Sequence, residues 1–89
     1  MEGNENYKKG HYRKASKCYN QALSHFNALY DLTEEEEEEV KAAKLPLYLN
    51  LAACYIKLNE ITKAITNAEK VKHNIKLSVN LFFLKGSPN

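Results

Sequence analysis

The sequence predicts an all-α protein in which two antiparallel helix hairpins stack as an α-solenoid and a further C-terminal helix follows. The main observation is a pattern of small and large residues that occurs twice, the second copy 49 positions after the first. A repeated pattern of this kind is typical of stacked helical repeats, which usually hold a peptide of another protein. The matched pairs are Gly3 with Ala52, Tyr12 with Ile61, Ala15 with Ala64, and Ala22 with Val71.

Composition supports the same class. The chain has 89 residues, of which 44% are hydrophobic and 27% charged, as expected for a globular chain rather than a disordered one. This length corresponds to one small domain or to part of a larger protein. Because solenoid repeats bury their faces only against neighbours, two repeats alone are expected to be of low stability.

Residues 1–30 are predicted to form the first repeat, with an extended second helix. Residues 3–9 fit a short helix that ends at Gly10, which can adopt the left-handed conformation common just after a helix. From Tyr12 to about Tyr30, apolar residues recur at spacings of three and four, which indicates an amphipathic helix. These apolar positions are Tyr12, Ala15, Tyr19, Ala22, Leu23, Phe26 and Leu29.

Residues 31–44 are predicted to be an acidic joint and the start of the next helix. Thr33 precedes six consecutive glutamates, and Glu36 stands at the spacing of a capping box. Negative charge is favourable at the positive end of a helix dipole, although a low-complexity acidic linker is the alternative. We expect a kinked helix from about 35 to 58, because Pro46 removes one backbone hydrogen bond; a helix that begins at 45–46 would avoid the kink.

Residues 45–72 are predicted to be the second repeat. Asn59 stands at its turn, and asparagine tolerates positive φ better than most residues. Residues 60–72 form the partner helix, with an apolar face made by Ile61, Ala64, Ile65, Ala68 and Val71. Residues 73–89 are expected to be a capping helix over the second hairpin or a divergent partial third repeat, and periodicity alone leaves an exposed segment open.

Several function classes find no support in the sequence. Cys18 and Cys54 are isolated and are expected to be free thiols, and the three histidines show neither metal-ligand spacing nor a paired nucleophile. We therefore expect no metal, no cofactor and no catalysis. No apolar run approaches the length of a membrane span, so a cytoplasmic protein is expected.

Charge is distributed in blocks. The net charge of +2 divides into +3 over residues 1–30, −7 over residues 31–39 and +6 over residues 40–89. Such blocks can steer charged partners or be solvated helix faces. Nucleic-acid binding is not expected, because the chain lacks interleaved exposed aromatics and any nucleic-acid motif.

Residues 3–72 resemble tetratricopeptide repeats (TPR), most nearly the repeat region that follows the isomerase domain in immunophilins of the FK506-binding-protein type. The resemblance rests on Gly3-Asn4-x-x-Tyr7-x-x-Gly10-x-Tyr12-x-x-Ala15, on Ala42 to Pro46, and on Leu49 to Leu58. A plain repeat has about 34 residues. The larger offset here matches the lengthened helix and acidic joint of those immunophilins. A parent isomerase domain, if there is one, would lie outside these residues.

The resemblance implies a co-chaperone module that binds the acidic C-terminal tail of Hsp90 or Hsp70 in a concave groove through a two-carboxylate clamp. Asn4 and Asn50 match the two clamp asparagines, and the first clamp lysine would precede Met1. In one register Lys76 is the third-repeat lysine and Asn80 replaces the arginine; in the alternative register Asn80 replaces the lysine and Leu84 the arginine. Neither register supplies the arginine, so weak binding is expected.

Each candidate also has a structural interpretation. Asn4 can cap a helix, Asn50 can be satisfied by a neighbouring backbone, and Lys76 can be a solvated lysine. The tyrosines at repeat positions are expected to pack the core. The second functional hypothesis is a truncated or divergent repeat fragment, a monomer or a weak self-associating species, that docks on itself or on a non-chaperone protein through its apolar C-terminal segment.

Overall fold

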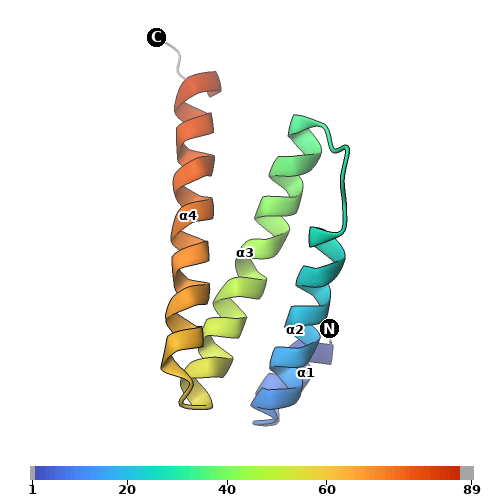
Figure 1. Ribbon diagram of the computed structural model, residues 1–89, viewed down its shortest axis with the longest axis vertical. Helices are drawn as coiled ribbons and strands as arrows, with labels where there is room; N and C mark the ends of the chain where they lie inside the picture. The colour runs from blue at the N-terminus through green and yellow to red at the C-terminus, as the bar shows by residue number, and fades with distance from the viewer. Residues whose placement is uncertain (1, 87–89) are drawn as a thin grey trace.

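The computed structural model describes the backbone of residues 2–86 and the side chains of residues 2–75. Over this range the chain forms four helices and no strand: α1 (Glu2–Lys8), α2 (Tyr12–Asn27), α3 (Glu34–Lys57) and α4 (Ile61–Gly86) (Figure 1). The main contacts are between helices adjacent in the chain, α1 with α2, α2 with α3, and α3 with α4. The all-α prediction of stacked antiparallel hairpins is therefore confirmed.

The turns within both hairpins use the residues that the sequence indicates. Gly10 has φ of 82° between α1 and α2, and Asn59 has φ of 61° between α3 and α4. Asp31 also lies in this left-handed region, at φ of 55°, within the loop that joins the two hairpins. That loop begins earlier than expected, because α2 ends at Asn27 and leaves Leu29 half exposed rather than packed in the core.

The acidic run is the start of α3 and not a linker. Thr33 Oγ1 accepts a hydrogen bond from the Glu36 backbone N–H at 3.1 Å, and Glu36 Oε1 accepts one from the Thr33 N–H at 3.0 Å. This capping box satisfies two donors at the helix start. Pro46 lies inside the continuous helix and is exposed, so the alternative start at 45–46 is not adopted.

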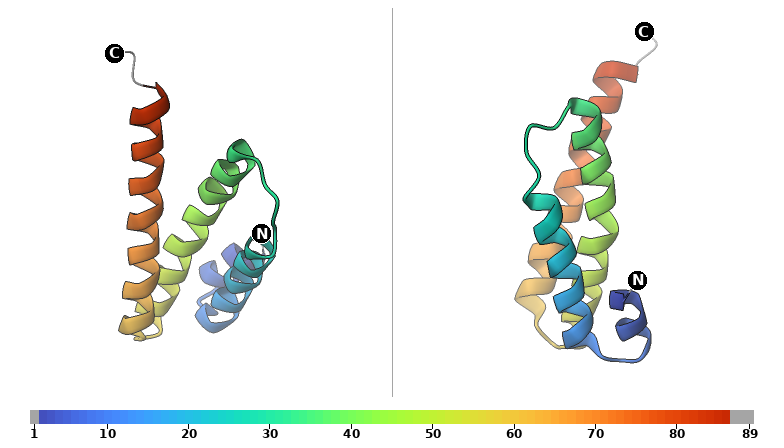
Figure 2. Two further views of the ribbon diagram at one scale, coloured as in Figure 1. Left: turned by 45° about the horizontal axis from the view of Figure 1, so that its top comes forward. Right: turned by 90° about the vertical axis from the view of Figure 1, so that its right-hand side faces the viewer.

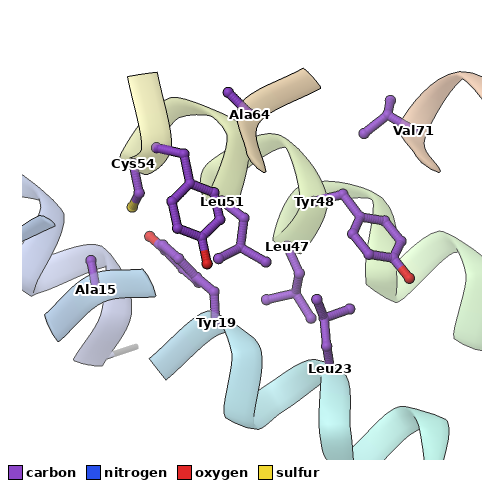
Figure 3. Close-up of a cluster of buried hydrophobic side chains, with 10 residues drawn as sticks. Ala15, Tyr19, Leu23, Leu47, Tyr48, Leu51, Cys54, Ala64 and Val71 are labelled. Atoms are coloured by element: carbon purple, nitrogen blue, oxygen red, sulfur yellow. The ribbon is translucent and has the colours of Figure 1, made fainter. Parts of the chain in front are cut away.

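The core lies where α2, α3 and α4 meet, and it includes Ala15, Ala64 and Val71 of the repeated pattern. Ala15, Leu51 and Cys54 have no exposed surface, and Tyr19 is 1% exposed. Figure 3 shows these residues gathered between α2 and α3, with Ala64 and Val71 closing the cluster from α4. The remaining buried apolar side chains are Leu23, Leu47, Tyr48 and Tyr55.

The C-terminal part differs from the prediction. α4 is one helix from Ile61 to Gly86, with no break near residue 73, so the expected separate C-terminal helix is the continuation of α4. The physical reason is local, since neither glycine nor proline occurs between Ile61 and Lys85 to stop the helix. In Figures 1 and 2, α3 and α4 diverge away from their shared turn.

The apolar face predicted for the second half of the hairpin is buried only in part. Ala64 and Val71 are buried as expected, whereas Ile61 is 50% and Ile65 53% exposed, and Ala68 is exposed too. α3 packs against one edge of α4, and these three residues lie on the neighbouring edge of the helix. The prediction that they pack in the hairpin core was therefore wrong.

Candidate peptide-binding site

Asn4 is positioned by a close approach between α1 and α2. Gly3 is buried, and a Cβ atom placed on it would lie 2.8 Å from Tyr19 Cε1 and 3.2 Å from Cys18 Cβ. The absence of a side chain therefore lets the α1 backbone rest on the Tyr19 ring. This approach brings the Tyr19 hydroxyl to Asn4, the residue after Gly3, and the hydroxyl donates a hydrogen bond to Asn4 Oδ1 at 2.6 Å.

This geometry excludes the simple capping role for Asn4. Asn4 is the third residue of α1 rather than the residue before the helix, and its side chain is engaged by α2 rather than by its own backbone. Its side chain is exposed. Burial raises the pKa of Tyr19, with smaller contributions from Cys54 and other neighbours, so the phenol keeps its proton.

Asn50 lies in the middle of α3, one residue before the fully buried Leu51, and is itself half buried. It has no hydrogen-bond partner among the described side chains and their backbone. Asn67 provides a useful contrast, because its Nδ2 donates to the Lys63 carbonyl oxygen at 2.8 Å, one turn earlier in α4. Asn50 does not adopt this backbone-satisfied arrangement in the described part of the chain.

The four predicted site positions divide into two groups. Asn4 and Asn50 come from α1 and α3, the first helices of the two hairpins, and both of these helices pack against α2. No hydrogen bond between the two amides occurs in the described structure. Lys76 and Asn80 fall within α4, but their side chains lie outside the described residues, so both stay predictions.

Two further polar contacts join the hairpins, Arg13 with Glu60 and Asn20 with Tyr55, and a third, Lys63 with Glu60, lies within the second hairpin. Arg13 Nη1 lies 2.7 Å from Glu60 Oε2, and Lys63 Nζ lies 3.4 Å from Glu60 Oε1. Desolvation alone would raise the pKa of Glu60, but the hydrogen bonds from Arg13 and Lys63 outweigh it and lower that pKa. Asn20 Nδ2 also donates to the Tyr55 hydroxyl at 3.1 Å. These contacts fix α2 relative to α3 and the start of α4.

Sequence reasoning placed Tyr19 in the core but missed its contact with Asn4. The signal was present, since a buried tyrosine hydroxyl usually finds a hydrogen-bond partner. Which residue accepts this hydrogen bond could not be predicted without the crossing of α1 and α2, because Asn4 and Tyr19 are 15 residues apart in the chain.

The largest hollow described on the surface does not contain either asparagine of the predicted site. It has a volume of about 580 Å³ and lies along α1 and α2. It is lined by Glu2, Asn6, Lys14, Lys17, Cys18, Asn20 and Gln21. The hollow and the two predicted asparagines therefore occupy different sets of residues.

The described residues offer little for other chemistry. They contain no group of three metal-ligating side chains, and both cysteines are free. Burial raises the pKa of the Cys54 thiol. Within the described part of the chain, no helix combines the length and apolar character that crossing a bilayer requires.

Comparison with known families decides what kind of repeat this is. The family model for the tetratricopeptide repeat matches residues 45–72, which comprise most of the second hairpin. The chain carries a tetratricopeptide repeat. No solved structure matches the chain.

Curated relatives match a longer part of the chain than the family model does. The chain is 46% identical over 56 residues to an inactive peptidyl-prolyl cis-trans isomerase, shutdown, of Bombyx mori, and the aligned segment covers 63% of the chain and 13% of that protein. It is 33% identical over 64 residues to the peptidyl-prolyl cis-trans isomerase FKBP4 of Bos taurus, where the alignment covers 72% of the chain and 14% of the relative. It is also 33% identical over 69 residues to the peptidyl-prolyl cis-trans isomerase PASTICCINO1 of Arabidopsis thaliana, with 78% of the chain and 11% of the relative covered.

These matches confirm the predicted resemblance. The chain is a TPR region with distant similarity to the TPR regions of FKBP-type immunophilins. It spans only about one eighth of the length of these relatives. Its function as a TPR protein is protein–protein interaction.

Proposed function

We propose that this TPR region is a non-enzymatic co-chaperone module that binds the acidic C-terminal peptide of an Hsp90- or Hsp70-like chaperone, weakly, through Asn4 and Asn50. The observation that carries the proposal is the Asn50 amide. It is half buried within the second hairpin and has no partner among the described residues. Its amide atoms are not sealed from solvent, so their N–H groups can donate to a ligand carboxylate.

Weak binding follows from the donors that the chain offers. Amide N–H groups can donate to a carboxylate, but the strong bonds in such sites come from cations, and arginine is the best of them. A hydrogen bond to a charged group contributes about 1.5–3 kcal/mol, which corresponds to one to two decades in affinity. Since no register of the sequence supplies the clamp arginine, we expect binding in the high micromolar to millimolar range.

A titration with a short peptide ending in Glu-Glu-Val-Asp tests the proposal. Calorimetry or NMR should detect binding of the peptide with a free C-terminal carboxylate and about tenfold weaker binding of its C-terminal amide. Asn50→Ala should weaken binding of the free acid by about tenfold. Asn27→Ala, on the exposed end of α2, is the matched control and should leave affinity unchanged. No binding by the wild-type chain at millimolar peptide would refute the proposal.

A second candidate function is favoured by exposed aliphatic side chains. Leu49 and Ile56 lie seven residues apart on one face of α3 and are 55% and 59% exposed. On α4, Ile61, Ile65 and Ile75 are each about half exposed. We infer that these exposed aliphatic groups on two neighbouring helices pack against a second copy of the chain. The apolar segment that the sequence suggested for this role lies outside the described side chains.

Sedimentation at several concentrations tests this second function. Self-association should raise the average mass with concentration, and Ile56→Glu should abolish the rise. Strictly monomeric behaviour at all concentrations would count against it.

A further inference from the structure

We propose that Tyr19 is a positioning residue that turns the Asn4 amide so that its N–H groups, and not its carbonyl oxygen, face an anionic ligand. This inference rests on the proposed function, because it concerns the site at which the peptide carboxylate would bind. Tyr19 itself does not touch the ligand. It acts through the hydrogen bond that its hydroxyl donates to Asn4 Oδ1.

The orientation matters because an asparagine side chain has two unlike ends. Its oxygen only accepts hydrogen bonds, and its nitrogen donates two. The terminal torsion of asparagine is broad, so an unrestrained amide presents either end. A carboxylate needs donors, and the carbonyl end would repel it. The chain must therefore select one of two orientations before Asn4 can contribute to binding a carboxylate.

The structure provides this selection. The Tyr19 hydroxyl donates to Asn4 Oδ1 at 2.6 Å, which engages the carbonyl end and leaves Nδ2 with its two hydrogens on an exposed side chain. Because the oxygen is held by α2, the donor end is the part of the amide that a ligand meets. Fixing the orientation in advance also reduces the entropy lost on binding.

The phenol that makes this contact is itself held rigidly. Tyr19 is 1% exposed and lies in the cluster with Leu51 and Cys54 (Figure 3). Gly3 allows the α1 backbone to rest on its ring. Burial keeps the hydroxyl protonated and therefore able to donate. Asn4 thus faces a donor whose place is fixed by the core, which is the usual way that a rigid scaffold supports a binding group.

Tyr19→Phe tests the inference, because it removes the hydroxyl and keeps the ring. Tyr55→Phe is the matched control: its hydroxyl is also bonded to an asparagine, Asn20, but accepts rather than donates and does not contact Asn4. Both variants should lose similar stability. Only Tyr19→Phe should weaken binding of the Glu-Glu-Val-Asp peptide, by about fivefold, and only for the free carboxylate.

A double-mutant cycle separates positioning from general loosening. In an Asn4→Ala background, Tyr19→Phe should have no further effect on affinity, since there is no amide left to orient. If Tyr19→Phe weakens binding equally with and without Asn4, or leaves the affinity of the wild-type background unchanged, the inference is overturned while the proposed function stands.

A readout without ligand completes the test. In ¹⁵N–¹H spectra of the free protein, the Asn4 side-chain NH₂ should give two well-separated proton signals. These signals should move toward those of a free amide in Tyr19→Phe and stay in place in Tyr55→Phe. Signals that do not respond to Tyr19→Phe would overturn the inference. If they respond but the wild-type chain binds no peptide, the proposed function fails and the orienting hydrogen bond is upheld.

Discussion

Replacement of Gly3 by alanine should destabilise the first hairpin, although alanine is the better helix former. The exchange gains about 1 kcal/mol of helix propensity in α1. Against this, the new Cβ would lie 2.8 Å and 3.1 Å from Tyr19 ring carbons and 3.2 Å from Cys18 Cβ. The Tyr19 ring is buried and Cys18 Cβ is fixed to the α2 backbone, so neither atom can move aside without displacing a helix. Overpacking of this kind costs about 1–3 kcal/mol.

We therefore expect Gly3→Ala to lower the free energy of unfolding by about 1 kcal/mol. The loss cannot exceed the free energy with which α1 docks on α2, because α1 would then detach. Urea unfolding followed by far-UV circular dichroism measures the total change, and amide hydrogen exchange in residues 2–8 reports whether α1 detaches. A second variant tests whether the Tyr19 ring causes the loss. In a Tyr19→Leu background the ring carbons are gone, and Gly3→Ala should then become stabilising.

Gly3→Ala that is neutral or stabilising in the wild-type background would refute the close approach of α1 and Tyr19. The same result would weaken the case for the hydrogen bond to Asn4, because that bond depends on the approach. A loss of the same size in both backgrounds would place the cost at Cys18 Cβ or in the α1 backbone instead.

Three further predictions concern other parts of the chain. Thr33→Ala should cost about 1 kcal/mol in urea unfolding. It should also raise the pKa of Glu36 in part, because the hydroxyl is lost while the backbone N–H at position 33, the larger cause of the lowered pKa, stays; an NMR titration that finds this pKa unchanged would contradict the contribution of the Thr33 hydroxyl. The pKa of Glu36 in the folded protein lies below the ordinary value of about 4.3, so its contribution to stability is complete above pH 4.3 and is lost as the pH falls through the folded-state pKa. Acid titration should find this pH dependence of stability weaker in Thr33→Ala. Pro46→Ala should stabilise the protein by about 1–3 kcal/mol in urea unfolding, since it restores a backbone donor inside α3, and any destabilisation would argue against this. A thiol reagent should modify the half-buried Cys18 in the native protein and reach Cys54 only on unfolding, so equal native rates would be inconsistent with the burial of Cys54.

Much of the fold could be predicted because it follows from local signals. The glycine at position 10 and the asparagine at position 59 mark the hairpin turns, and Thr33 with Glu36 marks the start of α3. Small residues at helix crossings identified the stacked faces, and Ala15 and Ala64 are indeed buried at equivalent places. Each of these signals needs only a few neighbouring residues to be read.

The errors arose where the repeat pattern and the local sequence disagree. The repeat pattern predicted a partner helix over residues 60–72 and a separate segment from residue 73, but the residues that follow contain no helix breaker up to Lys85, and α4 continues. The wrong prediction that Ile61 and Ile65 pack in the core has the same cause. Periodicity shows that these residues lie on an apolar face, but it does not show which part of that face a neighbouring helix covers.

The candidate site residues could be named from the sequence, but their geometry could not. Asn50 could be selected from its place among apolar residues, and the structure leaves its amide without a described partner. The Asn4 hydrogen bond depends on the crossing of α1 and α2 at Gly3, a tertiary contact that no local pattern encodes. Lys76 and Asn80 remain predictions from the sequence.

The neighbour-to-neighbour packing of the helices has a mechanical consequence. Because α1 contacts mainly α2, α2 mainly α3, and α3 mainly α4, a force applied at the two ends is carried by one helix pair at a time. The chain should then lengthen in separate steps under tension, as each pair peels apart, rather than in a single rupture. The ion pair between Arg13 and Glu60 joins the start of α2 to the turn before α4, so it should make the step that separates the two hairpins sensitive to salt.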